Sequence, residues 1–251
     1  MTSSELLESR LLDAPVSKRT KARGDVFYLV MAIVVAAVVT IGFAPNLDAR
    51  LLHPSSPRPT ILYLHVAVSI SWVLLFIAQA ALVRTRKVAW HRRLGLGGLA
   101  VGTLLPPLGL ATAIVTTRMG IAEDPAGSIG GMAFFAVSCL DMLAFSLAFG
   151  LAIAWRRRPD DHKRLMLIAT CCLLSAAFAR FPHWLVPSRM WYVAVDLLIL
   201  AGVAHDIVVA RSVHRVYRYA LPILILGQAA AMWISLTRAP AWIAAVRPLF
   251  A

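Results

Sequence analysis

Five ionisable side chains lie inside long apolar stretches of this 251-residue sequence, at His65, Asp141, Arg180, His183 and Asp196. A charged side chain at the centre of a bilayer costs about 2.5–3.5 kcal/mol on insertion scales, so such residues usually face the protein interior and mark a functional site. Counted at about 1.5 Å per residue from the ends of the predicted helices, all five lie in the same half of the bilayer. The sequence therefore predicts a polar site at this depth, built from side chains of four helices.

Two kinds of chemistry fit these residue types. Neutral imidazole binds copper, zinc and iron, and carboxylates often orient such histidines. His65 and His183 are predicted at similar depth, so they are the expected ligands in this half of the bilayer if haem b or a transition metal is bound. The charged residues predict a buried polar cluster of Asp141, Arg180 and Asp196, in which the arginine pairs with one of the acids. A purely structural role, in which these groups only fix helix packing, also fits the pattern.

The apolar stretches that must position these residues are long enough to cross a membrane. The sequence is 60% hydrophobic with a mean hydropathy of +0.76, above the ~45–50% apolar content of soluble domains. The stretches run for about 18–25 residues without period-2 alternation, which predicts helices rather than strands. The expected fold is an all-α, polytopic membrane helix bundle with seven transmembrane helices over 26–251, preceded by a polar and basic cytoplasmic segment over 1–25. The predicted helices cover residues 26–44, 60–83, 96–117, 131–155, 165–186, 190–210 and 219–236.

The basic residues alternate between the predicted loops. Lys and Arg cluster before the first helix and after the second, fourth and sixth helices, whereas the other loops hold only scattered arginines. The positive-inside rule then predicts a cytoplasmic N-terminus and an external C-terminus in a bacterial inner (cytoplasmic) membrane. The same rule accounts for the net charge of +13, so no nucleic-acid partner is expected. The lipid bilayer is the expected partner, and a second membrane protein or a second copy of this chain is a further candidate.

Two more histidines stand at the predicted cytoplasmic entrances of helices. His91 lies in AWHRRLG and His162 in DDHKRLM, and each is followed by two basic residues and a leucine. Imidazoles in these places could bind a second cofactor. Alternatively, they could lie in the headgroup layer as interface residues.

Several functional classes are excluded by what the sequence lacks. All four lysines fall in predicted cytoplasmic segments, so no buried lysine is available for a retinal Schiff base. The sequence has no phosphate-binding glycine-rich loop, no HExxH and no GxSxG motif. The three cysteines lie in apolar stretches without CxxC spacing and are expected to be core residues. No catalytic residue is predicted, and a non-enzymatic function is favoured.

Two segments carry a resemblance to known groups of proteins. The stretches HVAVSISWVLLFIAQAALVRTRKVAWHRRLG and RRRPDDHKRLMLIAT resemble uncharacterised bacterial membrane proteins, which have six or seven helices, a His near the start of the second helix, and HRxLG and HKRxM segments. A more distant resemblance is to small multi-histidine membrane proteins implicated in the assembly of haem-copper oxidases. That resemblance implies that His65, His91 and His162 contact haem or a metal. The sequence departs from the pattern because it has no HH pair that would fix a ligand set.

Three functions follow from these observations. The leading hypothesis is a haem- or metal-associated membrane protein that acts in electron transfer or in the maturation of a respiratory complex. One alternative is a small-solute or proton-coupled transporter that uses the same charged residues. Another is a non-catalytic structural subunit of a membrane complex. A bound chromophore in the purified protein would separate the first hypothesis from the other two.

Overall fold

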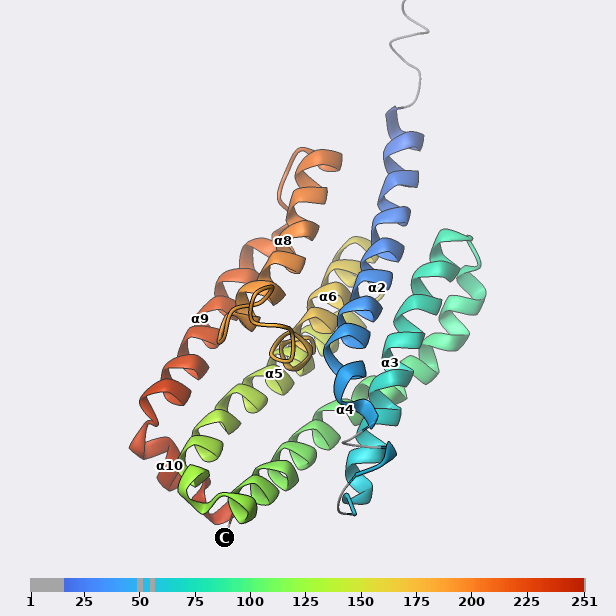
Figure 1. Cartoon of the computed structure of the whole chain (residues 1–251). Helices are drawn as coiled ribbons and strands as arrows, with labels where there is room; N and C mark the ends of the chain where they lie inside the picture. The colour runs from blue at the N-terminus through green and yellow to red at the C-terminus, as the bar shows by residue number, and fades with distance from the viewer. Residues whose placement is uncertain (1–15, 49–51, 55–56, 251) are drawn as a thin grey trace, which may run out of the picture.

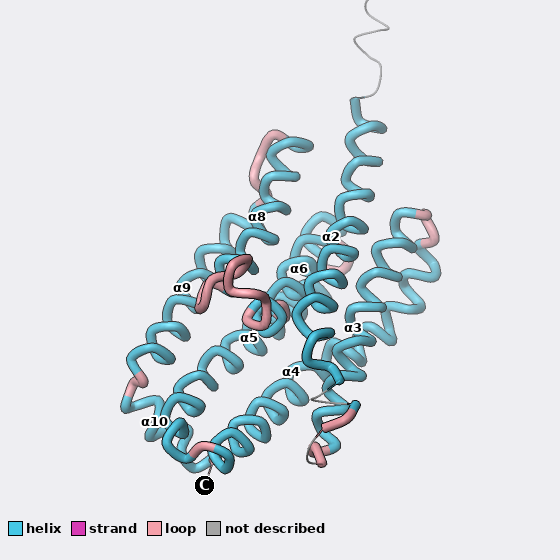
Figure 2. The backbone as a smooth tube through the Cα atoms, viewed as in Figure 1, coloured by secondary structure: helices cyan, strands magenta, loops and turns pink. Residues whose placement is uncertain are grey.

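A computed structural model describes residues 16–48, 52–54 and 57–250, and this part of the chain folds into helices without a strand (Figures 1 and 2). Of the predicted N-terminal segment 1–25, residues 1–15 lie outside the described residues, and 16–25 begin the first long helix. The long helices are α2 (Val16–Leu47), α3 (Thr60–Arg84), α4 (Val88–Glu123), α5 (Ser128–Ala154), α8 (Trp191–Ala210) and α9 (Arg215–Thr237).

Six helices in the described ranges are long and apolar enough to cross a membrane. Their outward side chains are apolar as well: Leu96, Val208 and Leu226 are 72%, 72% and 70% exposed. A helix on the surface of a soluble protein would carry polar side chains on that face, whereas a lipid-facing helix would not. These features support a helical membrane protein, but the predicted count of seven crossing helices is not confirmed.

Helix α5 lies at the centre of the bundle. It packs against α4, α9 and the shorter α6 (Pro159–Cys172). Phe145 and Phe149 of α5 stack with ring centroids 5.4 Å apart, and Trp72 of α3 meets these rings edge-on at 5.3 and 5.5 Å. Stacked and edge-on arrangements are the favoured geometries of aromatic pairs. This aromatic cluster therefore fixes α3 relative to the central helix.

The predicted helix over 165–186 is not continuous, which corrects the sequence prediction. Helix α6 ends at Cys172, the short α7 (Ser175–Phe178) follows after a turn, and a non-helical segment then leads to α8. At about 1.5 Å per residue the 14-residue α6 reaches about 21 Å, short of the ~30 Å hydrocarbon layer. Pro182 has no N–H group and restricts Phe181, so it disfavours a helix that continues from α7 into the segment before α8.

Helix α7 is held inside the bundle by α2 and α8, which both pack against it. Gly42 of α2 permits this close approach, because a Cβ atom there would lie 2.5 Å from the carbonyl oxygen of Ala177. At membrane depth, non-helical backbone is tolerated only where it is buried in protein or lines a cavity. The packing of α7 against its two neighbours meets this condition for a broken helix.

The two ends of the bundle differ in charge. The α3–α4, α5–α6 and α8–α9 connections lie at the end where α2 begins, at the top of Figure 1. We call it the arginine-rich end, after the basic residues of these connections and the adjoining helix starts: Arg86, Lys87, Arg92, Arg93, Arg156, Arg157, Arg158, Lys163, Arg164, Arg211, Arg215 and Arg218. The opposite end holds the α4–α5 connection with the 3-10 helix η2 (Pro125–Gly127), helix α10 (Pro240–Val246) and the 3-10 helix η3 (Arg247–Leu249).

Candidate functional site

Asp141 lies at the midpoint of α5, and its side chain is buried. One carboxylate oxygen accepts a hydrogen bond from the Ser175 hydroxyl, and the other accepts one from the Tyr192 hydroxyl at 3.0 Å. Both of these hydrogen bonds come from uncharged groups. Asp141 is therefore a buried acid whose hydrogen-bond partners are neutral hydroxyls.

Three helices bring these groups together. Helix α5 runs unbroken past Asp141, Ser175 is the first residue of α7, and Tyr192 is the second residue of α8. One turn further along α8, Asp196 accepts a hydrogen bond from the Gln228 amide of α9 at 2.9 Å. Residues four apart on a helix share a face, so Tyr192 and Asp196 place the two hydrogen-bonded groups along one face of α8. We call the whole set the polar chain: Ser175, Asp141, Tyr192, Asp196 and Gln228.

The described contacts of Arg180 lie outside the polar chain. Its guanidinium donates a hydrogen bond to the Ala176 carbonyl oxygen and lies over the Phe43 ring, 4.6 Å from the ring centroid. The helical face that would aim it at Asp141 or Asp196 ends with α7, two residues earlier, and Arg180 is exposed. The predicted buried cluster of these three charges stays a prediction, which the described contacts do not favour, because each acid bonds to neutral groups.

The two histidines predicted as joint ligands lie on different parts of the bundle. His65 is half-buried on the second turn of α3, and its Nδ1 is buried without a hydrogen-bond partner in the described chain. His183 is exposed on the segment after α7. Helix α2 packs against both α3 and α7 and lies between them (Figure 1). Joint ligation of one cofactor by these histidines stays a prediction, which this packing does not favour.

The fold brings together the other two predicted histidines, His91 of α4 and His162 of α6. Their ring centroids are 6.4 Å apart and their planes are nearly perpendicular, at 84°. His162 Nδ1 lies 2.8 Å from the Ala152 carbonyl oxygen, so an Nδ1–H that donates to this oxygen leaves Nε2 without a proton. His91 Nδ1 is buried and has no hydrogen-bond partner in the part of the chain that is described. This pair, which we call the histidine pair, is a candidate ligand set at the arginine-rich end.

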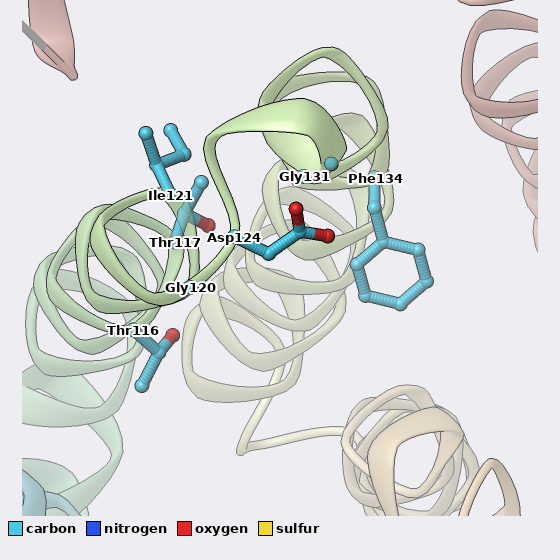
Figure 3. Close-up of a pocket in the computed structure, with 8 residues that line it drawn as sticks. Thr116, Thr117, Gly120, Ile121, Asp124, Gly131 and Phe134 are labelled. Atoms are coloured by element: carbon cyan, nitrogen blue, oxygen red, sulfur yellow. The ribbon is translucent and has the colours of Figure 1, made fainter.

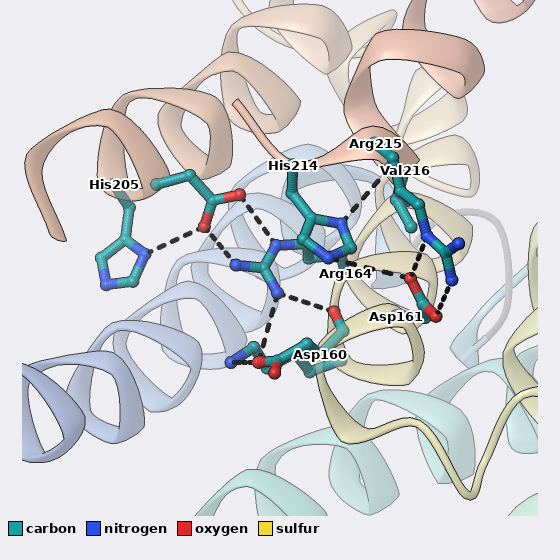
Figure 4. A network of polar contacts seen from close by, with 9 residues as sticks. Asp160, Asp161, Arg164, His205, His214, Arg215 and Val216 are labelled. Carbon is teal, nitrogen blue, oxygen red and sulfur yellow. Dashed lines mark hydrogen bonds and ion pairs between the residues drawn. The ribbon is translucent and has the colours of Figure 1, made fainter. Parts of the chain in front are cut away.

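Two bidentate ion pairs connect helix ends at the arginine-rich end (Figure 4). Arg164 of α6 donates to both carboxylate oxygens of Asp206 of α8, and Arg215 of α9 donates to both oxygens of Asp161 of α6. The Arg215 guanidinium lowers the pKa of Asp161 by hydrogen bonding to it. The sequence prediction missed these pairs because their members are 42 and 54 residues apart. The only signal was the presence of acids beside basic clusters.

Two cavities are open at the surface. One, of about 290 Å³, lies at the α4–α5 connection, and Asp124 is the ionisable residue in its lining (Figure 3). The other, of about 240 Å³, follows the segment between α7 and α8, and we call it the α7–α8 cavity. It adjoins the polar chain, because Phe178 lies three residues after Ser175 and Trp191 directly precedes Tyr192. Its lining residues are Phe178, Ala179, His183, Val186, Pro187, Ser188, Arg189 and Trp191.

The described residues contain no group of three or more His, Cys, Asp or Glu side chains that could hold a metal ion. Cys171 and Cys172 are buried and free, and Cys139 is half-buried and free. The candidate functions rest on the geometry of the polar chain and of the histidine pair. Comparison with protein-family models, with curated proteins and with solved structures found no match.

Proposed function

We propose that the protein is a proton-coupled transporter of a small solute, with Asp141 as the group that takes up and releases the proton. The observation that carries this proposal is a buried carboxyl group at the midpoint of α5, bonded to the hydroxyls of Ser175 and Tyr192. An ionised carboxylate in an apolar interior is strongly destabilised unless a cation or a proton accompanies it. Ionisable residues inside membrane proteins commonly form proton relays or substrate pathways.

The broken helix supports the same function. In many transporters the binding site lies near the bilayer midplane, where transmembrane helices are discontinuous and unwound backbone lines a cavity. Here the break between α6 and α7 places Ser175 against Asp141, so the broken helix and the buried acid form one site. A carboxylate only accepts hydrogen bonds, whereas a carboxylic acid also donates one. Proton uptake at Asp141 would therefore rearrange the hydrogen bonds that hold α7 and α8 to α5.

Access to the polar chain differs between the two ends of the bundle. The α7–α8 cavity adjoins the chain on one side. On the other side, the two bidentate ion pairs hold the ends of α6, α8 and α9 together. A transporter alternates between states that expose its site to one side at a time. The observed arrangement matches a state that is open toward the α7–α8 cavity and closed toward the arginine-rich end.

The positive-inside rule favours an orientation with the arginine-rich end in the cytoplasm and the lipid bilayer of a bacterial inner membrane around the helices. Helix α2 starts at this end, and the C-terminal end of the chain lies at the other (Figure 1). Helix α6 starts at the arginine-rich end, and α8 returns to this end. The break in the predicted helix over 165–186 therefore does not change the side on which the C-terminus lies. The proposed topology keeps the N-terminus inside and the C-terminus outside.

Infrared difference spectroscopy of the purified protein tests the role of Asp141. A change from acidic to alkaline buffer should remove a carboxylic-acid carbonyl band from the wild-type spectrum, and Asp141→Asn should lack that band. Asp124→Asn, at the exposed α4–α5 connection, is the matched control and should keep it. In proteoliposomes, proton entry driven by gradients of small metabolites should be lost in Asp141→Asn and kept in Asp124→Asn. Identical spectra for wild type and Asp141→Asn would remove the proposal.

The histidine pair favours a second candidate function, haem or metal association. Two imidazoles on opposite sides of one metal ion, with metal–nitrogen distances of about 2.0 Å, have ring centroids roughly 6 Å apart, and a tetrahedral angle shortens this to roughly 5 Å. His91 and His162 show such a spacing, 6.4 Å, and the bond from His162 to the Ala152 carbonyl is the contact that commonly orients a ligating imidazole. A site of this kind suits copper, zinc or haem iron. It would serve electron transfer or the maturation of a respiratory complex.

An optical spectrum and a metal analysis of the purified protein test this second candidate. The wild type should show a Soret band or stoichiometric metal, and His91→Ala and His162→Ala should each remove it. His183→Ala, on the segment after α7, is the control and should retain it. A colourless, metal-free wild type would assign His91 and His162 to helix packing.

A further inference from the structure

The α7–α8 cavity has the lining of an anion site. Two of its lining residues, His183 and Arg189, are basic, and none of its lining residues is an acid. Both side chains are exposed, and within the described residues neither forms a hydrogen bond or an ion pair. Ser188 adds a hydroxyl, and Phe178 and Trp191 add aromatic surface. We propose that this cavity binds a small monocarboxylate, which is the solute of the transporter proposed above.

Arg189 has an unusual backbone conformation. Its φ is +71°, in the left-handed region that residues other than glycine rarely adopt. Three other arginines have positive φ, at 86, 211 and 238, but each of these directly follows or closely follows the end of a long helix. Arg189 instead lies in a turn closed by a 3.0 Å hydrogen bond from Met190 N–H to the Pro187 carbonyl. Strain of this kind tends to occur at binding sites, where it aims a particular side chain.

The size of the cavity limits the ligand to a small molecule. Its volume of about 240 Å³ lies below the ~300–1,000 Å³ of pockets that hold drug-sized ligands. A planar guanidinium binds a carboxylate through two parallel hydrogen bonds, and an aromatic wall contacts the apolar part of such an acid. A single carboxylate group on a compact apolar body matches this lining better than a polyanion or a cation does.

The position of the cavity links this anion to the proton on Asp141. Phe178 and Trp191, on the cavity wall, flank Ser175 and Tyr192, the two hydroxyl residues that bond to Asp141. The membrane potential acts on an anion that crosses the membrane alone, whereas a proton and a monocarboxylate together carry no net charge. Monocarboxylates, the solute class that fits the cavity, are therefore also solutes whose charge a co-transported proton neutralises.

Equilibrium binding of radiolabelled benzoate to the full chain in phosphatidylcholine nanodiscs tests the inference. Benzoate should bind, and neither benzyl alcohol nor benzylamine, which have the same ring without the negative charge, should displace it. Loss of a charge-assisted hydrogen bond costs about 1.5–3 kcal/mol, so Arg189→Gln should weaken binding by roughly 10- to 100-fold. His183→Gln should weaken it less. Arg238→Gln is the matched control, because Arg238 is also exposed with positive φ but does not line the cavity.

The outcomes separate this inference from the proposed function on which it rests. No benzoate binding by the wild type, or equal binding by Arg189→Gln, overturns the carboxylate site. Displacement of benzoate by phosphatidylglycerol but not by acetate also overturns it and assigns the cavity to a lipid headgroup. Asp141→Asn should still bind benzoate while it lacks the infrared band. If the wild type binds benzoate but lacks the infrared band, only the proton-carrier role of Asp141 is overturned. If the wild type shows the band but does not bind benzoate, only the carboxylate site is overturned.

Discussion

The Arg164 guanidinium holds the Asp206 carboxylate with two hydrogen bonds, from Nε at 2.8 Å and from Nη2 at 2.6 Å. Both side chains are buried, with 8% and 1% of their surface exposed. The pair connects the start of α6 to the last turn of α8, and it lies beside the second ion pair, from Arg215 to Asp161. The arginine-rich end is thus closed by specific charge pairs rather than by apolar packing alone.

Removal of one member of the buried pair should destabilise the protein strongly. Breaking a buried ion pair typically costs about 3–5 kcal/mol, because the remaining charge loses its partner. We expect Asp206→Leu to lower the thermal unfolding midpoint in detergent, and Arg164→Met with Asp206→Leu to recover most of the loss. Lys163→Met, which removes an exposed partner of Asp160, is the control and should change stability by less than about 1 kcal/mol. Equal effects of Asp206→Leu and Lys163→Met would contradict the structure.

The ion pair between Arg215 and Asp161 should make the stability of the protein depend on pH in the acidic range. Hydrogen bonding from Arg215 lowers the pKa of Asp161 in the folded protein. The resulting stabilisation is complete above the unfolded pKa of about 3.9 and is lost as the pH falls through the lowered folded value. The unfolding midpoint of the wild type should therefore fall more steeply in acid than that of Arg215→Gln. Parallel curves for the two proteins would show that this pair does not contribute.

The close approach of α2 and α7 should not tolerate a larger residue at Gly42. A Cβ there would lie 2.9 Å from both the carbonyl carbon and the Cα of Ala177, and this backbone cannot rotate away. Overpacking of this kind costs typically about 1–3 kcal/mol, so Gly42→Ala should lower the unfolding midpoint. Gly98→Ala is the control, because a Cβ at Gly98 would meet no atom within 4 Å and alanine favours the helix. A stabilising Gly42→Ala would contradict the packing.

Labelling of single cysteines in a cysteine-free background should establish the topology. Ser212 and Ala126 are exposed, at the arginine-rich end and at the α4–α5 connection. We expect a membrane-impermeant thiol reagent applied to intact cells to label Ala126→Cys and not Ser212→Cys, and inside-out vesicles to give the reverse. Labelling of both from the same side would contradict the proposed orientation.

The periodicity of the apolar stretches predicted most of the helices, but it did not find the break near Leu173. Residues on both sides of the break are apolar, so a hydropathy average passes over it. The break depends on tertiary contacts, including the Ser175–Asp141 hydrogen bond and the fit of Ala177 against Gly42. The direction predicted for Arg180 likewise assumed a helical face, and α7 ends at Phe178, before this residue.

The sequence predicted which residue types form the candidate site, but it did not predict which residues pair with one another. Membrane insertion costs single out Asp141 and Asp196 from the sequence alone. Their hydroxyl and amide partners could not be identified, since Ser, Tyr and Gln are ordinary in membrane helices and these partners lie on other helices. His91 and His162 were singled out separately, but only the fold shows that their rings lie 6.4 Å apart.

The short α6 has a consequence for biogenesis. Its first turns carry Asp161 and Arg164, whose partners Arg215 and Asp206 are synthesised 54 and 42 residues later. When α6 leaves the ribosome, it therefore presents the translocon with a 14-residue segment in which Asp161 and Arg164 do not yet have these partners. We expect nascent chains that stop before α8 to leave this segment accessible to protease at the membrane surface, and chains that extend through α9 to protect it. Insertion of this part of the protein would then proceed as a unit of three helices and not one helix at a time.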